Sequence, residues 1–151
     1  MAPLQSSSHA RGRARRDTAM IENALPVTNL SVFANGLIYL ILTWRVIRLR
    51  RRDGIVLGDD GNRIMTKRIR GHANAAEQIP LALILIALLE FQGIDTELLA
   101  GLAMLFTLGR ALHAAYFTIH GTHWRFRMWG MAATLAAQAG LLLLMAYTLL
   151  S

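Results

Sequence analysis

Apolar residues gather in four blocks of about 20 residues, separated by short polar stretches. A helix of about 20 residues crosses the ~30 Å hydrocarbon core of a bilayer. The pattern predicts four helices, over about residues 25–50, 64–91, 96–119 and 126–150. We therefore expect an all-α membrane protein folded as a four-helix transmembrane bundle.

The second predicted helix is apolar only in its later part. From Ile79 to Leu89 no side chain is polar, and that run covers only about 16 Å of helix. The preceding turns must help to cross the membrane, which places Asn74 and Glu77 in or near the hydrocarbon. At 100° per residue, Arg70, Asn74 and Glu77 share one stripe. Because ionisable groups are costly at this depth, the stripe should face a bundle interior or a cavity.

The third predicted helix carries a similar polar group. Arg110 and His113 lie one turn apart in an otherwise apolar segment, and Tyr116 continues from His113. An arginine so far from a polar connection needs an anionic partner. Glu77 is a candidate within the chain, and a bound anionic ligand is the other.

Cations outnumber acids among these polar positions. Arg48, Arg70, Arg110 and Arg127 stand against Glu77. One interpretation is a set of buried ion pairs that fixes helix packing. The other is a missing negative partner, such as a carboxylate-rich solute, since arginine binds carboxylates through two parallel hydrogen bonds.

Composition supports a membrane protein of one domain. The 151 residues are 54% hydrophobic, with a formal charge of +7 and a mean hydropathy of +0.39. Most basic residues lie between the apolar blocks, which favours membrane topology and anionic lipid over nucleic acid as their role. The absence of cysteine excludes disulfides, thiolate nucleophiles and cysteine-based metal sites.

Charge also predicts topology. Residues 1–20 form a basic, serine-rich segment that we expect to be a disordered tail, and residues 21–151 form the membrane domain. A translation start at Met20 is an alternative. The connection between the first two helices is rich in arginine, and the connection between the last two carries Arg125 and Arg127. The positive-inside rule places both connections in the cytoplasm and both termini outside, in a bacterial inner membrane.

Metal and hydrolase sites have little support in the sequence. The connection over residues 53–62 holds glycines and aspartates, but it lacks the alternating ligands and closing glutamate of a calcium loop. His113, His120 and His123 have no carboxylate nearby in sequence. No HExxH, GxSxG or Walker pattern occurs. We expect no metal site.

Four segments together resemble the MAPEG family, the membrane-associated proteins in eicosanoid and glutathione metabolism. The most specific is RGHANAAEQIPLALILIALLE, which has the family's R-x-x-x-N-x-x-E-x-x-P arrangement. The others are VIRLRRR, LGRALHAAY and RFRMWG. The resemblance covers about residues 25–150 and looks closest to the bacterial branch.

The resemblance implies a homotrimer that binds glutathione between neighbouring subunits near the cytoplasmic side. It implies the following positions as contacts for glutathione: Arg48, Arg70, Asn74, Glu77, Arg110, His113 and Tyr116. It implies Arg127, with Arg125 as the alternative, as the arginine that stabilises the glutathione thiolate. Two positions depart from the eicosanoid and detoxifying members, which often have arginine where Ala73 stands and tyrosine where Phe117 stands.

Three functions follow as hypotheses. The first is a glutathione-dependent transferase or peroxidase that acts on small lipophilic electrophiles. The second, motivated by the two departures, is a non-catalytic trimeric membrane scaffold or a lipid- or anion-binding protein. The third is a transporter subunit with Glu77 as its coupling group, although no inverted repeat is visible in the sequence.

Overall fold

The computed structural model describes residues 25–150, which fold into four helices. They are α2 (Pro26–Asp53), α3 (Arg63–Phe91), α4 (Thr96–Thr118) and α5 (Trp124–Leu150). The predicted four helices are confirmed. The largest differences are that α2 continues to Asp53 and that α5 begins at Trp124. The predicted tail over residues 1–20 lies outside the described residues.

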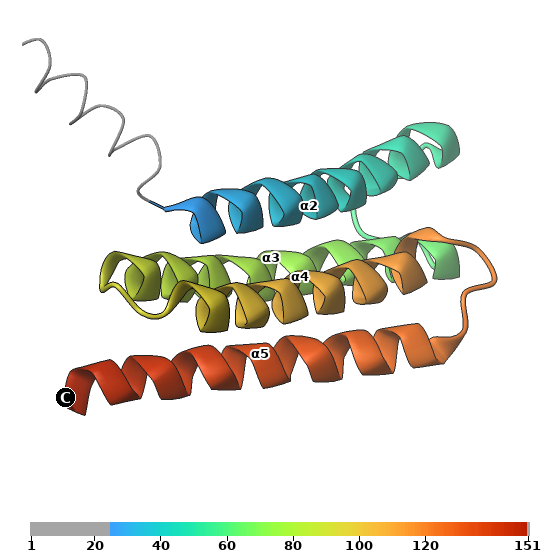
Figure 1. Ribbon diagram of the computed structural model, residues 1–151. Coiled ribbons are helices and arrows are strands. Elements are labelled where there is room, and N and C mark those ends of the chain that lie inside the picture. The colour runs from blue at the N-terminus through green and yellow to red at the C-terminus, as the bar shows by residue number, and fades with distance from the viewer. Residues whose placement is uncertain (1–24, 151) are drawn as a thin grey trace, which may run out of the picture.

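The helices form an up-and-down bundle in which α3 and α4 lie between α2 and α5 (Figure 1). Short connections over residues 54–62, 92–95 and 119–123 make successive helices antiparallel. Both central helices pack against α2 and α5, whereas α2 and α5 do not contact each other. The outer faces of α2 and α5 are therefore uncovered.

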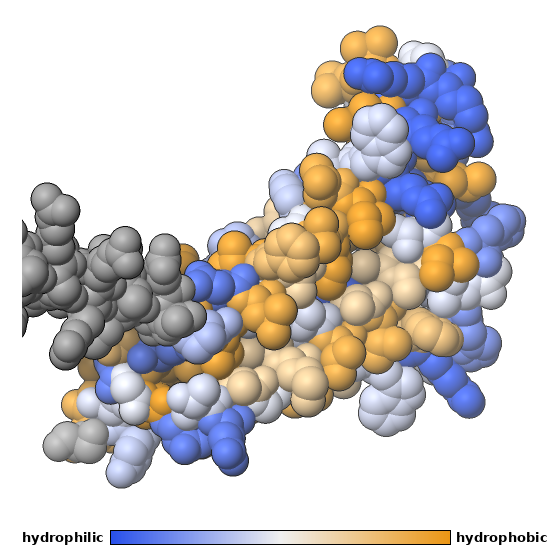
Figure 2. Space-filling model, turned by 45° about the horizontal axis from the view of Figure 1, so that its top comes forward, coloured by the Kyte–Doolittle hydropathy of each residue, from blue (hydrophilic) through white to orange (hydrophobic). Residues whose placement is uncertain are grey.

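All four helices are long and apolar enough to cross a membrane. Large apolar side chains cover the outside, among them Leu30, Phe33, Leu143 and Leu149. Figure 2 shows this hydrophobic surface along the bundle and a concentration of hydrophilic residues towards one end. Lipid is the solvent in which such a surface is stable, so the chain is a multi-pass membrane protein.

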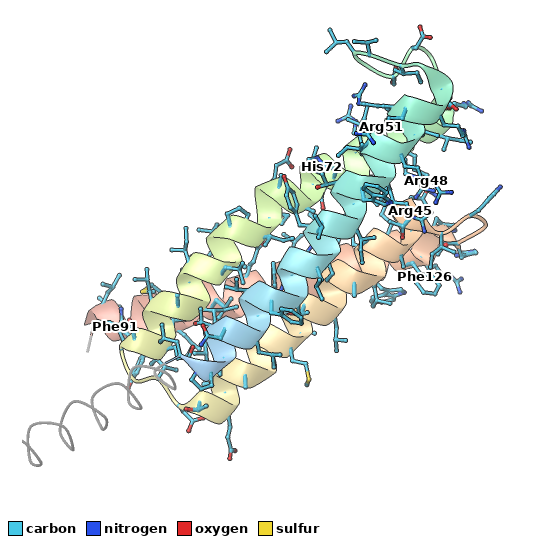
Figure 3. The ribbon with its side chains drawn as sticks, turned by 90° about the horizontal axis from the view of Figure 1, so that it is seen from above. Arg45, Arg48, Arg51, His72, Phe91 and Phe126 are labelled. Carbon is cyan, nitrogen blue, oxygen red and sulfur yellow. The ribbon has the colours of Figure 1, made fainter. Side chains whose placement is uncertain are left out.

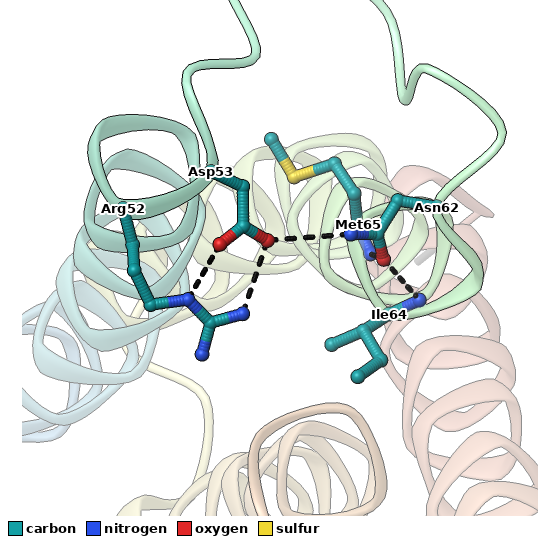
Figure 4. Close-up of polar contacts among 5 residues, drawn as sticks. All are labelled: Arg52, Asp53, Asn62, Ile64 and Met65. Carbon is teal, nitrogen blue, oxygen red and sulfur yellow. Dashed lines mark hydrogen bonds and ion pairs between the residues drawn. The ribbon is translucent and has the colours of Figure 1, made fainter.

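Polar contacts connect the adjoining ends of α2 and α3 (Figure 4). Asn62 caps α3, because its side-chain oxygen accepts from the backbone N–H groups of Ile64 (2.9 Å) and Met65 (3.1 Å). The Asn62 amide also donates to Asp53 (3.3 Å), which pairs with Arg52 (2.6 Å). This network fixes the connection at the basic end of the bundle.

At the opposite end, Glu90 of α3 caps α2. Its carboxylate oxygens accept from the backbone N–H groups of Val27 (2.9 Å) and Thr28 (2.7 Å). The residue at the N-cap of α2, Leu25, has no side chain that could do this. A carboxylate here also lies at the positive end of the helix dipole, so Glu90 stabilises the start of α2.

The helices α4 and α5 are in close contact at two glycines, Gly109 and Gly130. A methyl group added to Gly130 would lie 2.5 Å from the backbone nitrogen of His113, and one added to Gly109 would lie 2.8 Å from that of Thr134. Such contact between small residues is typical of packed membrane helices. It brings the first turn of α5, with Arg127, beside the polar part of α4.

Candidate functional site

A cavity of about 610 Å³ opens between the first half of α3, the end of α4 and the start of α5. We call it the α3–α5 cavity. Its lining residues are Arg63, Thr66, Lys67, Arg70, Ala73, Asn74, Glu77, His113, Tyr116, Phe117 and Arg127. Its volume is within the range of small-molecule sites.

The structure brings most of the sequence-predicted site residues together in this cavity. Arg70, Asn74 and Glu77 line it from α3, as their shared stripe predicted. From the neighbouring helices come His113, Tyr116 and Arg127. The cavity thus brings together residues from three helices. Arg70 and Arg127, for example, are more than 50 positions apart in the sequence.

Arg110 lies behind the cavity wall and is fully buried. Its Nη2 donates to Asn74 Oδ1 (2.9 Å) and lies 3.2 Å from His113 Nδ1. Its Nε and Nη1 have no hydrogen-bond partner among residues 25–150. Arg110 therefore orients two lining side chains and keeps donor capacity unused.

The suggested ion pair between Arg110 and Glu77 is absent. Within the described residues, the ion pair that forms is Arg52 with Asp53. Arg110 instead uses the neutral acceptors Asn74 and His113, because these lie on the helix faces that meet it. Buried ion pairing therefore does not account for the cation excess in this part of the chain.

Among the described residues, Glu77 is the acidic residue that lines this cavity. Its side chain is exposed and accepts no hydrogen bond from the described part of the chain. Four basic residues line the same cavity: Arg63, Lys67, Arg70 and Arg127. The cavity therefore offers several cations and one carboxylate to a ligand.

Aromatic rings form the floor of the cavity. The Phe117 ring is buried, with its centroid 4.9 Å from that of His113 and 5.0 Å from that of Tyr116. Gly71 makes room for it, since an added methyl group there would lie 2.6 Å from Phe117 Cβ. The ammonium of Lys67 lies 3.9 Å from the centre of the Tyr116 ring, a cation–π contact.

Arg48 lies elsewhere. It lines a second cavity of about 500 Å³ between the end of α2, the start of α3 and the end of α4, which we call the α2–α4 cavity. Its lining residues are Arg45, Arg48, Leu49, Arg52, Ile64, Lys67, Arg68, Phe117, Ile119 and His120. Lys67 and Phe117 line both cavities and separate them. Arg125, the alternative to Arg127, is exposed and lines neither cavity.

Three lining residues, Arg63, Thr66 and Lys67, were not predicted from the sequence. Steps of three and four residues back from Arg70 along α3 reach all three, so they extend the stripe that was already recognised. Thr66 and Lys67 lie inside the predicted helix over residues 64–91, but all three residues precede the strictly apolar run that begins at Ile79. Within residues 25–150, no group of three or more His, Cys, Asp or Glu side chains could hold a metal ion.

Comparison with known proteins assigns a family to this arrangement. Over 111 residues, the chain is 33% identical to inner membrane protein YecN of Escherichia coli strain K12. The match covers 74% of this chain and 83% of that protein. The protein of the same name from E. coli O6:H1 gives the same values. Residues 28–147, which include the lining residues of both cavities and nearly all of the four helices, match the MAPEG family. The chain belongs to the MAPEG family.

Proposed function

We propose that the α3–α5 cavity binds glutathione and that the bound thiol is transferred to, or used to reduce, lipophilic electrophiles. The observation that carries this proposal is the charge of the lining, with four basic residues around Glu77. Glutathione has two carboxylates and one ammonium group. The arginines suit its carboxylates, and Glu77 suits its amine.

Arg127 is the proposed catalytic residue. It lines the cavity from the first turn of α5. A guanidinium near a thiol lowers the thiol pKa and raises the thiolate fraction at neutral pH. The thiolate would attack an electrophilic carbon, form a carbon–sulfur bond and expel the leaving group with its electron pair, while the thiol proton passes to water. Because the chain has no cysteine, the nucleophile belongs to the ligand.

The membrane setting suits such a reaction. Lipophilic electrophiles concentrate in the bilayer, and the cavity opens among helices whose outer surface is apolar. We further propose a bacterial inner membrane, with the basic connections in the cytoplasm, where the positive-inside rule places them. The name of the E. coli relative, an inner membrane protein, supports this location.

A homotrimer is part of the same proposal. Asn29 and Gly36 of α2 are exposed in a single chain, although small and polar residues in membrane helices prefer to face other helices. The exposed positions of Arg70 and Glu77 also leave their outer sides open to a neighbouring subunit. A second copy would then complete the glutathione site.

Calorimetry on the detergent-solubilised protein tests glutathione binding. Arg70→Ala should weaken binding about 10- to 100-fold, since a hydrogen bond to a charged group contributes about 1.5–3 kcal/mol. Arg51→Ala is the matched control, because Arg51 is exposed and lines neither cavity. Absence of binding heat with the unmodified chain, or equal losses in both variants, would refute the proposed ligand.

A second candidate, a non-catalytic trimeric scaffold or anion-binding protein, is favoured by two lining residues. Phe117 is buried against Gly71 and His113 and cannot offer a hydroxyl to a ligand. Ala73, which also lines the cavity, offers only a methyl group. Glutathione binding combined with a rate towards an aromatic halide equal to that of buffer would select this candidate over the enzyme.

A further inference from the structure

Gln138 of α5 donates a hydrogen bond to the backbone of α3 beside the α3–α5 cavity. Its Nε2 lies 3.1 Å from the carbonyl oxygen of Gln78. Gln78 directly follows Glu77, the last of the α3 residues that line the cavity. Because α3 contacts α5 less extensively than it contacts α2 or α4, few other groups fix these two helices to each other. The bond from Gln138 joins them at the inner end of the cavity.

A proline makes α3 easier to bend at the same place. Pro80 lies near the middle of α3, between His72 and Phe91, which Figure 3 labels. Because proline has no N–H group, the carbonyl of Ala76 loses the donor that an α-helix would supply four residues later. Helices bend at such positions. The part of α3 before Pro80 carries the cavity wall, so the direction of that wall depends on the contacts that hold it.

The two parts of α3 are held in different ways. After Pro80, the helix is fixed by the bonds of Glu90 to α2 and by three fully buried side chains, those of Ala82, Ile86 and Leu89. Before Pro80, Asn74 attaches the helix to α4 through Arg110 (2.9 Å). Gln138 attaches it to α5. The bond from Gln138 is therefore the contact that ties the cavity wall to the helix that carries Arg127.

A small bend at Gln78 is enough to change the cavity. Arg70 lies eight residues before Gln78, which is about 12 Å along the helix. A rotation of about 5° at Gln78 therefore moves Arg70 by ~1 Å relative to Arg127 on α5. A displacement of ~1 Å in an active site costs up to about 100-fold in rate. The position of Gln78 against α5 thus has to be well defined if the two helices act on one ligand.

We propose that Gln138 is a positioning residue, which holds α3 against α5 beside Pro80 and so sets the distance between the α3 wall of the cavity and Arg127. This inference rests on the function proposed above. Arg70 and Glu77 bind glutathione from α3, and Arg127 stabilises its thiolate from α5. Without the bond from Gln138, glutathione stays bound to α3, but its sulfur moves away from the guanidinium.

Hydrogen exchange of the full chain in detergent micelles, without ligand, tests whether Gln138 holds α3. Gln138→Met keeps the size of the side chain but removes the donor. Amides over residues 77–84 should exchange about 3- to 10-fold faster, the factor to which one lost hydrogen bond corresponds. Gln92→Met is the matched control. Gln92 is exposed beyond the opposite end of α3, with its Nε2 3.8 Å from Met145 Sδ, and its loss should leave exchange over residues 77–84 unchanged.

Kinetics with glutathione and an aromatic halide test the positioning role. Gln138→Met should lower kcat about 10-fold and change KM for glutathione by less than about twofold, because the binding residues of α3 stay with the ligand. Added to Arg127→Ala, it should lower kcat by less than about twofold more, since Gln138 acts through Arg127. Gln138→Asn, which keeps the amide but is one methylene shorter, should also lower kcat and leave KM unchanged.

Three results would overturn the inference. They are equal exchange in Gln138→Met and the original chain, a loss of kcat as large in the Arg127→Ala background as in the original, and a raised KM with kcat unchanged. Circular dichroism checks the fold of each variant, and if Gln138→Met does not fold, Gln138→Asn decides. Absence of glutathione binding by the original chain would instead refute the proposed function, and the exchange measurement would still decide whether Gln138 holds α3.

Discussion

Two carboxylates on α3 show how differently the two halves of this bundle use polar groups. Glu90 accepts hydrogen bonds from the backbone N–H groups of Val27 and Thr28 across the helix interface. Glu77, about 20 Å nearer the basic end, lines a cavity and has no hydrogen-bond or ion-pair partner in the described chain. The same residue type closes the fold at one end and is left available at the other.

The difference follows from what each half leaves unpaired. At the Glu90 end, the first backbone N–H groups of α2 have no acceptor within the helix, and Glu90 accepts from two of them. At the Glu77 end, cations and the donors of buried Arg110 exceed the acceptors that the described residues provide. Because unpaired polar groups at membrane depth are costly, the excess indicates partners from outside the chain.

Arg127→Ala should give the largest effect of the variants that test this comparison, a loss in the rate of thiol transfer. We expect thiol transfer to an aromatic halide to fall about 10²- to 10³-fold, the usual loss when one donor to a developing or bound anion is removed. The loss should be greatest near neutral pH and shrink towards pH 9. Without Arg127, the thiol pKa returns towards its ordinary value of about 8.5, so only about 3% of the thiol is thiolate at pH 7. This accounts for up to about 30-fold of the loss near neutral pH, and the lost donor to the bound sulfur anion accounts for the rest.

Rates across pH in micelles, with Arg125→Ala alongside, measure this prediction. A larger loss in Arg125→Ala than in Arg127→Ala would transfer the role to Arg125 and contradict the assignment from the cavity lining. A pH-independent loss in Arg127→Ala would contradict the role in thiolate stabilisation.

Glu77→Gln should weaken glutathione binding about 10- to 100-fold, because an ionic hydrogen bond to the ligand's amine is lost. The free energy of unfolding should stay within about 0.5 kcal/mol of the original, since no group among residues 25–150 forms an ion pair or hydrogen bond with the Glu77 side chain. Calorimetry measures the first quantity and denaturant titration in micelles the second.

A glutathione analogue without the α-amino group is the control for Glu77→Gln. It should bind the original and the variant equally. Unequal binding of the analogue would show that Glu77 acts on the cavity's shape or on another ligand group. If Glu77→Gln lowered the free energy of unfolding as much as the loss of a helix cap does, Glu77 would stabilise the fold as Glu90 does, and the contrast between them would be contradicted.

The sequence predicted these two halves unequally. Hydropathy predicted the helices because burial in lipid requires long apolar runs, and the 100° rotation per residue predicted the stripe of Arg70, Asn74 and Glu77. Both are local properties of the chain. Pairing between helices depends on rotation and crossing in three dimensions, which is why the suggested bond between Arg110 and Glu77 was wrong.

Glu90 and Arg48 also show that contacts between helices cannot be predicted from local sequence. Glu90 reaches Val27, 63 positions away, and no local pattern indicates that contact. The resemblance implied Arg48 as a glutathione contact between neighbouring subunits; within one chain Arg48 lines another cavity, beyond Phe117 and Lys67, so that contact stays a prediction. The sequence of a membrane helix indicates how deep a residue lies in the membrane, but it does not indicate which neighbouring helix its side chain faces.

Glu90→Gln should affect stability and leave binding unchanged, which is the reverse of Glu77→Gln. Glutamine keeps one acceptor oxygen, so one backbone N–H of α2 loses its partner and the helix dipole loses its counter-charge. We expect the free energy of unfolding to fall by about 1–2 kcal/mol. Glu97→Gln, exposed at the same end, should change it by much less. A loss of glutathione affinity in Glu90→Gln would show that the two halves are coupled.

The smallest effect concerns Asp59, a carboxylate at the basic end that the protein does satisfy. It accepts from the Thr66 hydroxyl (2.6 Å) and from the Gly61 backbone N–H (3.2 Å). These bonds, the Thr66 hydroxyl first, lower the pKa of Asp59 below its usual value. The stabilisation is therefore complete above that usual value, about 3.9, and is lost as pH falls through the lower pKa of the folded state.

Hydrogen exchange of the connection over residues 54–62 measures the effect at neutral pH. Asp59→Asn, which mimics protonation, should speed exchange of the Gly61 amide, whereas Asp60→Asn should not, because Asp60 is exposed and makes neither bond. Thr66 also lines the α3–α5 cavity, so Asp59→Asn leaves this lining hydroxyl with its bond to the Asn62 carbonyl (3.1 Å) while every lining cation stays in place. If glutathione affinity then stays the same, the charges of the lining and not the Thr66 hydroxyl determine binding. Glu77 would then differ clearly from Asp59 and Glu90, whose carboxylates accept hydrogen bonds within the protein. Equal exchange in the two variants would contradict the role of Asp59 in holding the connection.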